Sequence, residues 1–247
     1  MLKIDLANIK LDIGTSNEVK DIFIEAFDKE HTLKIMFLNA YALTIAQKDV
    51  EFKNALDSAG LLINDGVGIE KLVTKMGYKV PENLNGTDLI PKLVEIAAKK
   101  DKKVFLLGAK EEMVSAAAEE INSKYQKQVV ADYNNGFFDA IETDNIIERI
   151  NSSDAEFIIL GMGMPIQEKW IYNNADKLTN VKVIIAGGAI IDYMSGKLKR
   201  SPEIWVKLKL EWLYRMLREP KRLIKRNWAT IKVLIKFYFK VGKKNDI

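Results

Sequence analysis

The sequence predicts an α/β fold in which a parallel, Rossmann-like sheet carries helices on both faces. Two observations support this prediction. Short runs of residues that are apolar throughout alternate with longer segments whose apolar residues recur every three or four positions. Glycine or asparagine stands at or directly after the end of most of these runs, as expected where strands lead into tight loops. No internal repeat interrupts the alternation.

Six strands are expected, at 34–38, 61–64, 104–107, 129–131, 157–160 and 181–185. Six helical segments lie between or beside them, at 17–27, 40–58, 87–100, 111–124, 139–151 and 166–177. A strand that is apolar along its whole length must be buried on both faces, and parallel strands crossed by helices achieve this burial.

The last fifth of the chain differs from the rest in composition. Residues 195–247 hold 16 of the 38 Lys and Arg, 4 of the 34 Asp and Glu, and three of the four Trp. We therefore expect an α/β body at 1–194 and a basic helical appendage at 195–247. A helix break is expected near Glu219-Pro220, because proline suits the first turn of a new helix.

The segment after that break is predicted to be an amphipathic helix with basic residues around one apolar stripe. The stripe comprises Leu223, Ile224, Trp228, Ile231, Leu234, Ile235 and Tyr238. Such a helix lies in the interface of an anionic membrane, packs on the body, or binds nucleic acid through its cations. We favour the membrane and expect no nucleic-acid partner. A partner subunit covering the stripe, and hence a homo-oligomer, is also left open.

Composition excludes several kinds of chemistry. The chain has no Cys, so it lacks the residues for a thiolate nucleophile or a Cys-ligated metal, and its single histidine, His31, offers little material for a His-rich metal site or a Ser–His relay. Acid–base chemistry must then use Asp, Glu, Lys or Tyr. The N-terminus lacks the features of a secretory signal, and no apolar stretch reaches the roughly 18 residues of a membrane span. We therefore expect a cytoplasmic location.

Polar residues near the expected strand ends form a candidate site, because ligands bind at that edge of a parallel sheet. Asp65 follows the run LLIN and is either a base or the cap of a helix beginning near Val67. Gln167 and Glu168 follow the glycine turn of GMGMPIQEKW, and Asp192 follows a glycine pair. Alternatively, Glu168 and Asp192 only stabilise the N-termini of the helices in which they lie, through the helix dipole. Neither GxGxxG nor GxxxxGK[ST] occurs.

Taken in order, eight motifs resemble the WecG/TagA/CpsF glycosyltransferases, which are glycosyltransferase family 26. The resemblance extends from about residue 30 to residue 222. Its motifs are AQKD (46–49), NDGVGI (64–69), NGTDL (85–89), VFLLGAK (104–110), NGFF (135–138), GMGMPIQEKWI (161–171), GGAIIDYMSGKLKRSP (187–202) and LEWLYRMLREPKR (210–222).

The resemblance implies inverting transfer of N-acetylmannosamine or a related hexose from a UDP-sugar to an undecaprenyl-diphosphate-linked sugar. This step would serve cell-surface polysaccharide or teichoic-acid synthesis at the inner face of the cell membrane, without a metal or other cofactor. Asp65 matches the general base, and Gln167 matches a polar catalytic position. The donor is expected to meet Asn39, Gly66, Gly108, Gly136, Phe137, Gly163, Glu168 and Asp192. The acceptor diphosphate and the anionic membrane are expected to meet Lys199, Arg200, Arg215, Arg218 and Arg222.

The chain departs from the family pattern at several positions. Phe37-Leu38-Asn39 stands where the family has Thr-Pro-Asn, and Asn83 stands where it has Arg. Asn134–Phe138 replaces His-His-Gly-Tyr-Phe, and Ile166 replaces a Lys. A missing Arg removes a charge that would stabilise the leaving diphosphate. The alternative function is therefore a membrane-surface module that binds UDP-sugar or lipid diphosphate without turnover.

Overall fold

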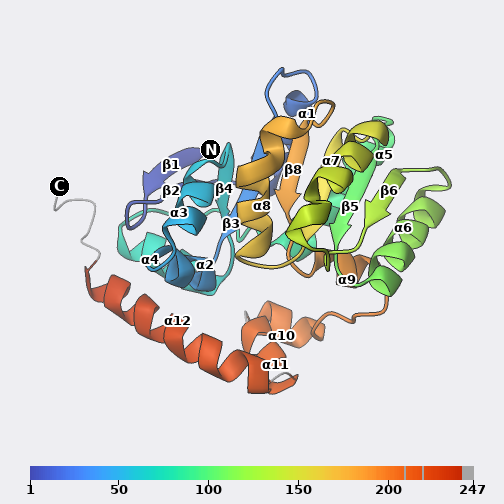
Figure 1. Ribbon diagram of the computed structural model, residues 1–247. Coiled ribbons are helices and arrows are strands. Elements are labelled where there is room, and N and C mark those ends of the chain that lie inside the picture. Colours follow the sequence, from blue (N-terminus) through green and yellow to red (C-terminus); the bar gives the residue numbers. More distant parts are fainter. Residues whose placement is uncertain (209, 219, 241–247) are drawn as a thin grey trace.

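The computed structural model describes residues 1–208, 210–218 and 220–240, and its strands form one sheet in the order β1-β2-β4-β3-β8-β7-β5-β6 (Figure 1). The six predicted strands are present and run parallel. Their bounds are β3 (Leu33–Leu38), β4 (Leu61–Asn64), β5 (Val104–Gly108), β6 (Val130–Asn134), β7 (Phe157–Gly161) and β8 (Val183–Ala186). The predicted α/β class with a Rossmann-like sheet is confirmed.

An N-terminal hairpin, which the sequence pattern did not predict, extends one edge of the sheet. Strands β1 (Leu2–Asp5) and β2 (Lys10–Ile13) pair antiparallel, and β2 pairs parallel with β4. Each strand has only four residues, and charged residues interrupt its apolar ones. Such strands lack the uniform apolar run by which the central strands were recognised.

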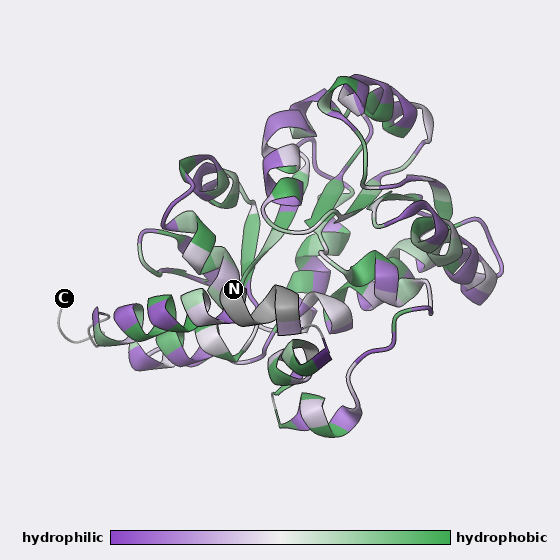
Figure 2. Cartoon of the chain, turned by 60° about the horizontal axis from the view of Figure 1, so that its bottom comes forward, coloured by the Kyte–Doolittle hydropathy of each residue, from purple (hydrophilic) through white to green (hydrophobic). Residues whose placement is uncertain are grey.

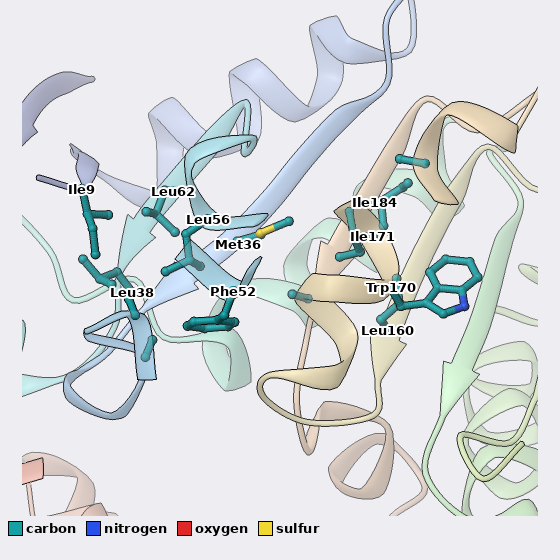
Figure 3. Packing of buried hydrophobic residues seen from close by; sticks show 14 of the residues in the cluster. Ile9, Met36, Leu38, Phe52, Leu56, Leu62, Leu160, Trp170, Ile171 and Ile184 are labelled. Carbon is teal, nitrogen blue, oxygen red and sulfur yellow. The ribbon is translucent and has the colours of Figure 1, made fainter. Parts of the chain in front are cut away.

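Helices cover both faces of the sheet, and alternate residues of each strand pack toward opposite faces. Ile184 of β8 and Leu160 of β7 face the same side as Ile171 of α8 (Figure 3). Figure 2 shows the strands as the most uniformly hydrophobic segments. The helices on that side are α2 (Ala40–Ala46), α3 (Val50–Asp57), α4 (Val67–Lys75), α7 (Thr143–Ser152) and α8 (Ile166–Asn174). The other side carries α1 (Ser16–Ala26), α5 (Gly86–Lys99), α6 (Glu111–Tyr125) and α9 (Ile190–Met194).

The helix expected over 40–58 is two helices, so that prediction was wrong. Asp49 begins α3 as its N-cap, and its Oδ1 accepts a hydrogen bond from the Phe52 N–H at 3.0 Å. The other carboxylate oxygen pairs with Nζ of Lys169 in α8 at 2.8 Å. An N-cap held by a distant lysine thus starts a second helix within an unbroken helical pattern. Two other expected helices are shorter than predicted. The start of the helix expected at 139–151 is the 3₁₀ turn η1 (Ala140–Glu142), and the end of the helix expected at 166–177 is the 3₁₀ turn η2 (Ala175–Lys177).

The order in which the chain adds strands to the sheet reverses near the middle of the sheet. β3 lies between β4 and β8, and β8 lies between β3 and β7, so late strands fill the gap between the two halves. The carboxyl ends are aligned, with Leu38 opposite Asn64 and Leu160 opposite Ala186. The loops that follow these four strands therefore meet at one edge, where open α/β sheets bind their ligands.

The appendage comprises α10 (Glu203–Lys207), α11 (Glu211–Arg218) and α12 (Pro220–Lys240). Glu219, where the helix break is expected, lies outside the described residues. Helix α12 packs across α2 and α4 (Figure 1). Thr230 and Phe237 are buried, and Leu234 packs on the core. A Cβ added to Gly68 of α4 would lie 3.1 Å from Cδ1 of Leu234. The second glycine of NDGVGI therefore lets α12 approach α4 closely.

The single apolar stripe expected on this helix is instead divided between two faces. Leu234 faces the body, whereas Trp228, Ile231, Ile235 and Tyr238 are exposed together with Phe239. The side chains of Leu223 and Ile224 lie outside the described residues. Packing on the body is thus observed, and an aromatic and aliphatic face remains on the opposite side. Within the described part of the chain, no helix combines the length and apolar character that a membrane span requires.

Phe237→Ala should release α12 from the body, because Phe237 is 5% exposed and packs on the core. A loss on the order of 3 kcal/mol in docking free energy is expected for removing a buried phenyl ring. Hydrogen exchange in α12 measures it. Phe239→Ala is the matched control, since Phe239 is 83% exposed. Equal exchange in both variants would contradict this packing.

Candidate active site

Asn39 and Asp65 lie side by side at the ends of two neighbouring strands. Asn39 is the N-cap of α2, and its Oδ1 accepts hydrogen bonds from the N–H groups of Tyr41 and Ala42 at 3.0 and 2.9 Å. These bonds fix the amide, so its Nδ2 donates to Oδ2 of Asp65 at 3.3 Å. The Asp65 N–H donates to the carbonyl of Leu38 at 2.9 Å. Both side chains are half-buried, which places a positioned carboxylate at the sheet edge.

The N-cap of α4 is Gly66, not Asp65. The Gly66 N–H donates to Oδ1 of Asn83 at 2.7 Å. Asn83, which stands where the related pattern has Arg, therefore fixes the turn that carries Asp65. Phe37, the other central departure, is buried in the core beneath this edge, and a Cβ on Gly86 would lie 3.4 Å from its ring.

Gln167 and Glu168 are close to the same edge but lie beneath its surface. They are 1% and 0% exposed. Oε1 of Gln167 accepts hydrogen bonds from the N–H groups of Gly163 and Gly188 at 3.2 and 3.0 Å. Its Nε2 donates to Oε1 of Glu168 at 2.8 Å. The pair thus joins the loops after β7 and β8, and burial raises the pKa of the Glu168 carboxyl to about 7.

The glycines that end β5 and β7, and the glycine in the loop after β6, have a packing role. A Cβ on Gly108 would lie 2.4 Å from the backbone of Gly161, and one on Gly136 would lie 2.9 Å from Cα of Gly108. The Gly136 N–H donates to the carbonyl of Ala109 at 2.8 Å. These loops therefore pack backbone against backbone. Phe137, next to Gly136, is 75% exposed.

Asp192 lies in the first turn of α9, near the loop that follows β5. Burial raises the pKa of its carboxyl, and the charge of Lys110 partly opposes this rise. Lys110 precedes α6 and is exposed. This cation was not predicted as a site residue, although it ends the motif VFLLGAK. Among the described residues, no three His, Cys, Asp or Glu side chains are grouped so that they could hold a metal ion.

Arg200 joins the appendage to the body. Its guanidinium pairs with Asp88 in the first turn of α5, and its Nε donates to Oε1 of Glu211 in α11 at 3.0 Å. The Ser201 hydroxyl donates to the same oxygen of Glu211 at 2.9 Å. The Arg200 charge holds the pKa of Asp88 below its usual range. Asp88, which lies within the motif NGTDL, was not predicted to contact the appendage.

The other cations expected at the acceptor are distributed differently. Lys199 is exposed, and the Arg218 guanidinium lies over the Tyr214 ring, 6.0 Å from its centroid. The side chains of Arg215 and Arg222 lie outside the described residues. Arg200 is thus the one member of the predicted set for which the described residues include carboxylate partners.

Arg200→Ala should loosen α10 and α11, because it removes hydrogen bonds to two carboxylates. Charge-assisted pairs of this kind contribute about 1.5 kcal/mol, which corresponds to roughly tenfold faster hydrogen exchange in α11. Lys199→Ala, which removes the neighbouring exposed cation, should leave this exchange unchanged. Identical exchange in the two variants would show that the Arg200 pairs do not hold the appendage.

Comparison with known proteins agrees with this arrangement. The chain matches the family described as "Glycosyl transferase WecG/TagA/CpsF family" over residues 4–246. It is 27% identical over 243 residues to the N-acetylglucosaminyldiphosphoundecaprenol N-acetyl-beta-D-mannosaminyltransferases of Staphylococcus aureus strains MW2 and COL. Each alignment covers 98% of this chain and 92% of the relative. The chain therefore belongs to the WecG/TagA/CpsF family and is a glycosyltransferase.

Proposed function

We propose that this glycosyltransferase moves N-acetylmannosamine or a related hexose from a UDP-sugar to a sugar carried on undecaprenyl diphosphate. The named activity of the Staphylococcus aureus relatives supports the sugar and the acceptor. The observation that carries the chemistry is the position of Asp65. It is half-buried, held by Asn39 and placed where the central strands end.

In this mechanism, Asp65 acts as general base. Its carboxylate takes the proton of the acceptor hydroxyl as the hydroxyl oxygen attacks the anomeric carbon of the donor. The bond from that carbon to the UDP oxygen breaks on the opposite face, so the configuration inverts. Negative charge then builds on the departing diphosphate. Asn83 carries no charge to meet it, so we assign this role to Lys110 and to the arginines of the appendage other than Arg200, whose guanidinium is paired with Asp88 and Glu211.

Asp65→Asn should lower transfer by about 10²–10⁴-fold, the usual contribution of a general base, and should leave UDP binding close to that of the unchanged protein. The assay follows formation of a disaccharide lipid by mass spectrometry, using UDP-N-acetylmannosamine and a short-chain prenyl-diphosphate N-acetylglucosamine. Asp154→Asn is the matched control, because Asp154 is exposed and precedes β7 at the opposite edge of the sheet. Full turnover by Asp65→Asn would remove Asp65 from this role. UDP binding by the unchanged protein without any transfer would favour the non-catalytic binding module.

The exposed face of α12 supports binding to the inner surface of the cell membrane. Trp228, Ile235 and Phe239 lie on this face, one or two helical turns apart. Lys232, Lys236 and Lys240 are also exposed on α12. Aromatic and aliphatic side chains beside lysines suit the interface of an anionic bilayer. The body-facing residues of α12 remain packed in this arrangement, so membrane binding requires no unfolding of the appendage.

The double variant Ile235→Glu, Phe239→Glu should lose most of its binding to vesicles that contain anionic lipid, because two carboxylates would replace apolar side chains at the interface. Vesicle co-sedimentation measures the bound fraction. Leu2→Glu is the control, since Leu2 is an exposed apolar residue on the edge strand β1. Undiminished binding of the double variant would exclude this face as the anchor.

A further inference from the structure

Glu168 is fully buried near the candidate site, yet the proposed mechanism gives it no step. Its Oε1 accepts the hydrogen bond from Gln167, and its Oε2 has no hydrogen-bond partner among the residues that the structure describes. An isolated buried carboxylate is costly, and proteins normally neutralise such a group by pairing or protonation. A buried acid without a cationic partner in an active-site motif therefore needs an explanation.

Two glycine N–H groups and Glu168 together fix the orientation of the Gln167 amide. Two N–H groups, from Gly163 and Gly188, both require an acceptor, so the amide oxygen must face them and the NH₂ group must face away. Glu168 supplies the acceptor on that side. Both glycines have left-handed backbones, with φ of 80° and 61°. Gln167 thus ties together two turns that follow neighbouring strands, and Glu168 keeps its amide correctly oriented.

The charged groups on the elements packed against α8 are paired with other residues or exposed to solvent. Helix α8 packs against α3, β8 and η2. Strand β8 has no charged residue, and no charged group contributes to the raised pKa of Glu168. On α3, Glu51 and the N-cap Asp49 both pair with Lys169 of α8, and Lys53 pairs with Asp57. On η2, Lys177 pairs with Asp144, and Asp176 is exposed.

We propose that Glu168 is a positioning residue whose uncharged carboxyl group holds Gln167 across the two glycine turns and keeps the donor side of the site free of buried negative charge. The proposal rests on the proposed function, because it takes the donor to carry a diphosphate. An ionised Glu168 would place an unscreened negative charge behind the two glycine turns, where this proposal places the donor diphosphate. The protonated acid keeps a carbonyl oxygen for Gln167 and adds no charge.

The consequence is a pH dependence of donor affinity. The pKa of Glu168 is about 7 in the folded protein, so raising the pH from 6 to 8 converts most of it to the charged form. If only the uncharged form binds UDP, affinity falls by about tenfold over this range. Glu168→Gln keeps an acceptor oxygen for Gln167 and is neutral at every pH, so it should lack this fall.

The experiment is calorimetric titration of UDP into the full-length protein and into Glu168→Gln at pH 6 and pH 8. Ionisation of UDP itself affects both proteins equally. For each protein, the dissociation constant of UDP at pH 8 is divided by the constant at pH 6. This ratio should be about tenfold larger for the unchanged protein than for the variant. Equal ratios would overturn the proposal. Failure of Glu168→Gln to fold would also overturn it, because glutamine is the nearest mimic of an uncharged glutamic acid.

A measurement without ligand separates this proposal from the proposed function. Infrared difference spectra between the unchanged protein and Glu168→Gln should show the carbonyl band of a protonated acid at pH 6, and this band should disappear by pH 8. Thermal stability should agree. The folded-state pKa of Glu168 lies above its ordinary value of 4.5, so stability is greatest below that value and falls as the pH rises toward 7, and this fall should be smaller in the variant.

Failure of the proposed function and failure of the Glu168 proposal therefore give different results. If UDP does not bind but the band titrates, Glu168 is the uncharged acid described here and the proposed donor is wrong. If UDP binds and no such band is present at pH 6, the donor assignment stands and the role of Glu168 is wrong.

Discussion

The structure depends on the burial of parallel strands on both faces. Because β3, β7 and β8 carry few polar side chains, helices must cover them on each side, and the chain must cross the sheet after almost every strand. The carboxyl ends of the parallel strands then lie at one edge. The insertion of β8 between β3 and β7 brings the loop of Asn39 close to the loops joined by Gln167. The candidate site is a direct result of this strand order.

Buried hydrogen bonds, more than exposed side chains, shape that edge. Asn39 orients Asp65, Asn83 holds the Gly66 turn, and Gln167 ties two glycine turns together. Each is an amide that satisfies backbone N–H groups which a loop would otherwise leave unpaired. Several motif residues are therefore explained by loop geometry. Asp65 differs from them, because it is a half-buried carboxylate at the edge itself.

The appendage combines two attachments in one segment. Helix α12 uses Leu234 and Phe237 to pack on the body and leaves Trp228 and Phe239 exposed on the other side. Arg200 adds an electrostatic link from α11 to α5, whose N-terminal motif follows Asn83. The appendage thus contacts α5 a short distance along the chain from Asn83, which holds the turn that carries Asp65.

The sequence by itself determined the parallel sheet, its six central strands and the placement of Asp65 and Asn39 near strand ends. Those features follow from local periodicity and from the residues that start and stop helices. It did not predict the N-terminal hairpin, the division at Asp49, the burial of Gln167 and Glu168, or the two faces of α12. Each of these depends on partners distant in the chain, such as Lys169 for Asp49 and Gly188 for Gln167. Only the tertiary structure could decide them, because the energy of burial or pairing depends on which distant residues become neighbours.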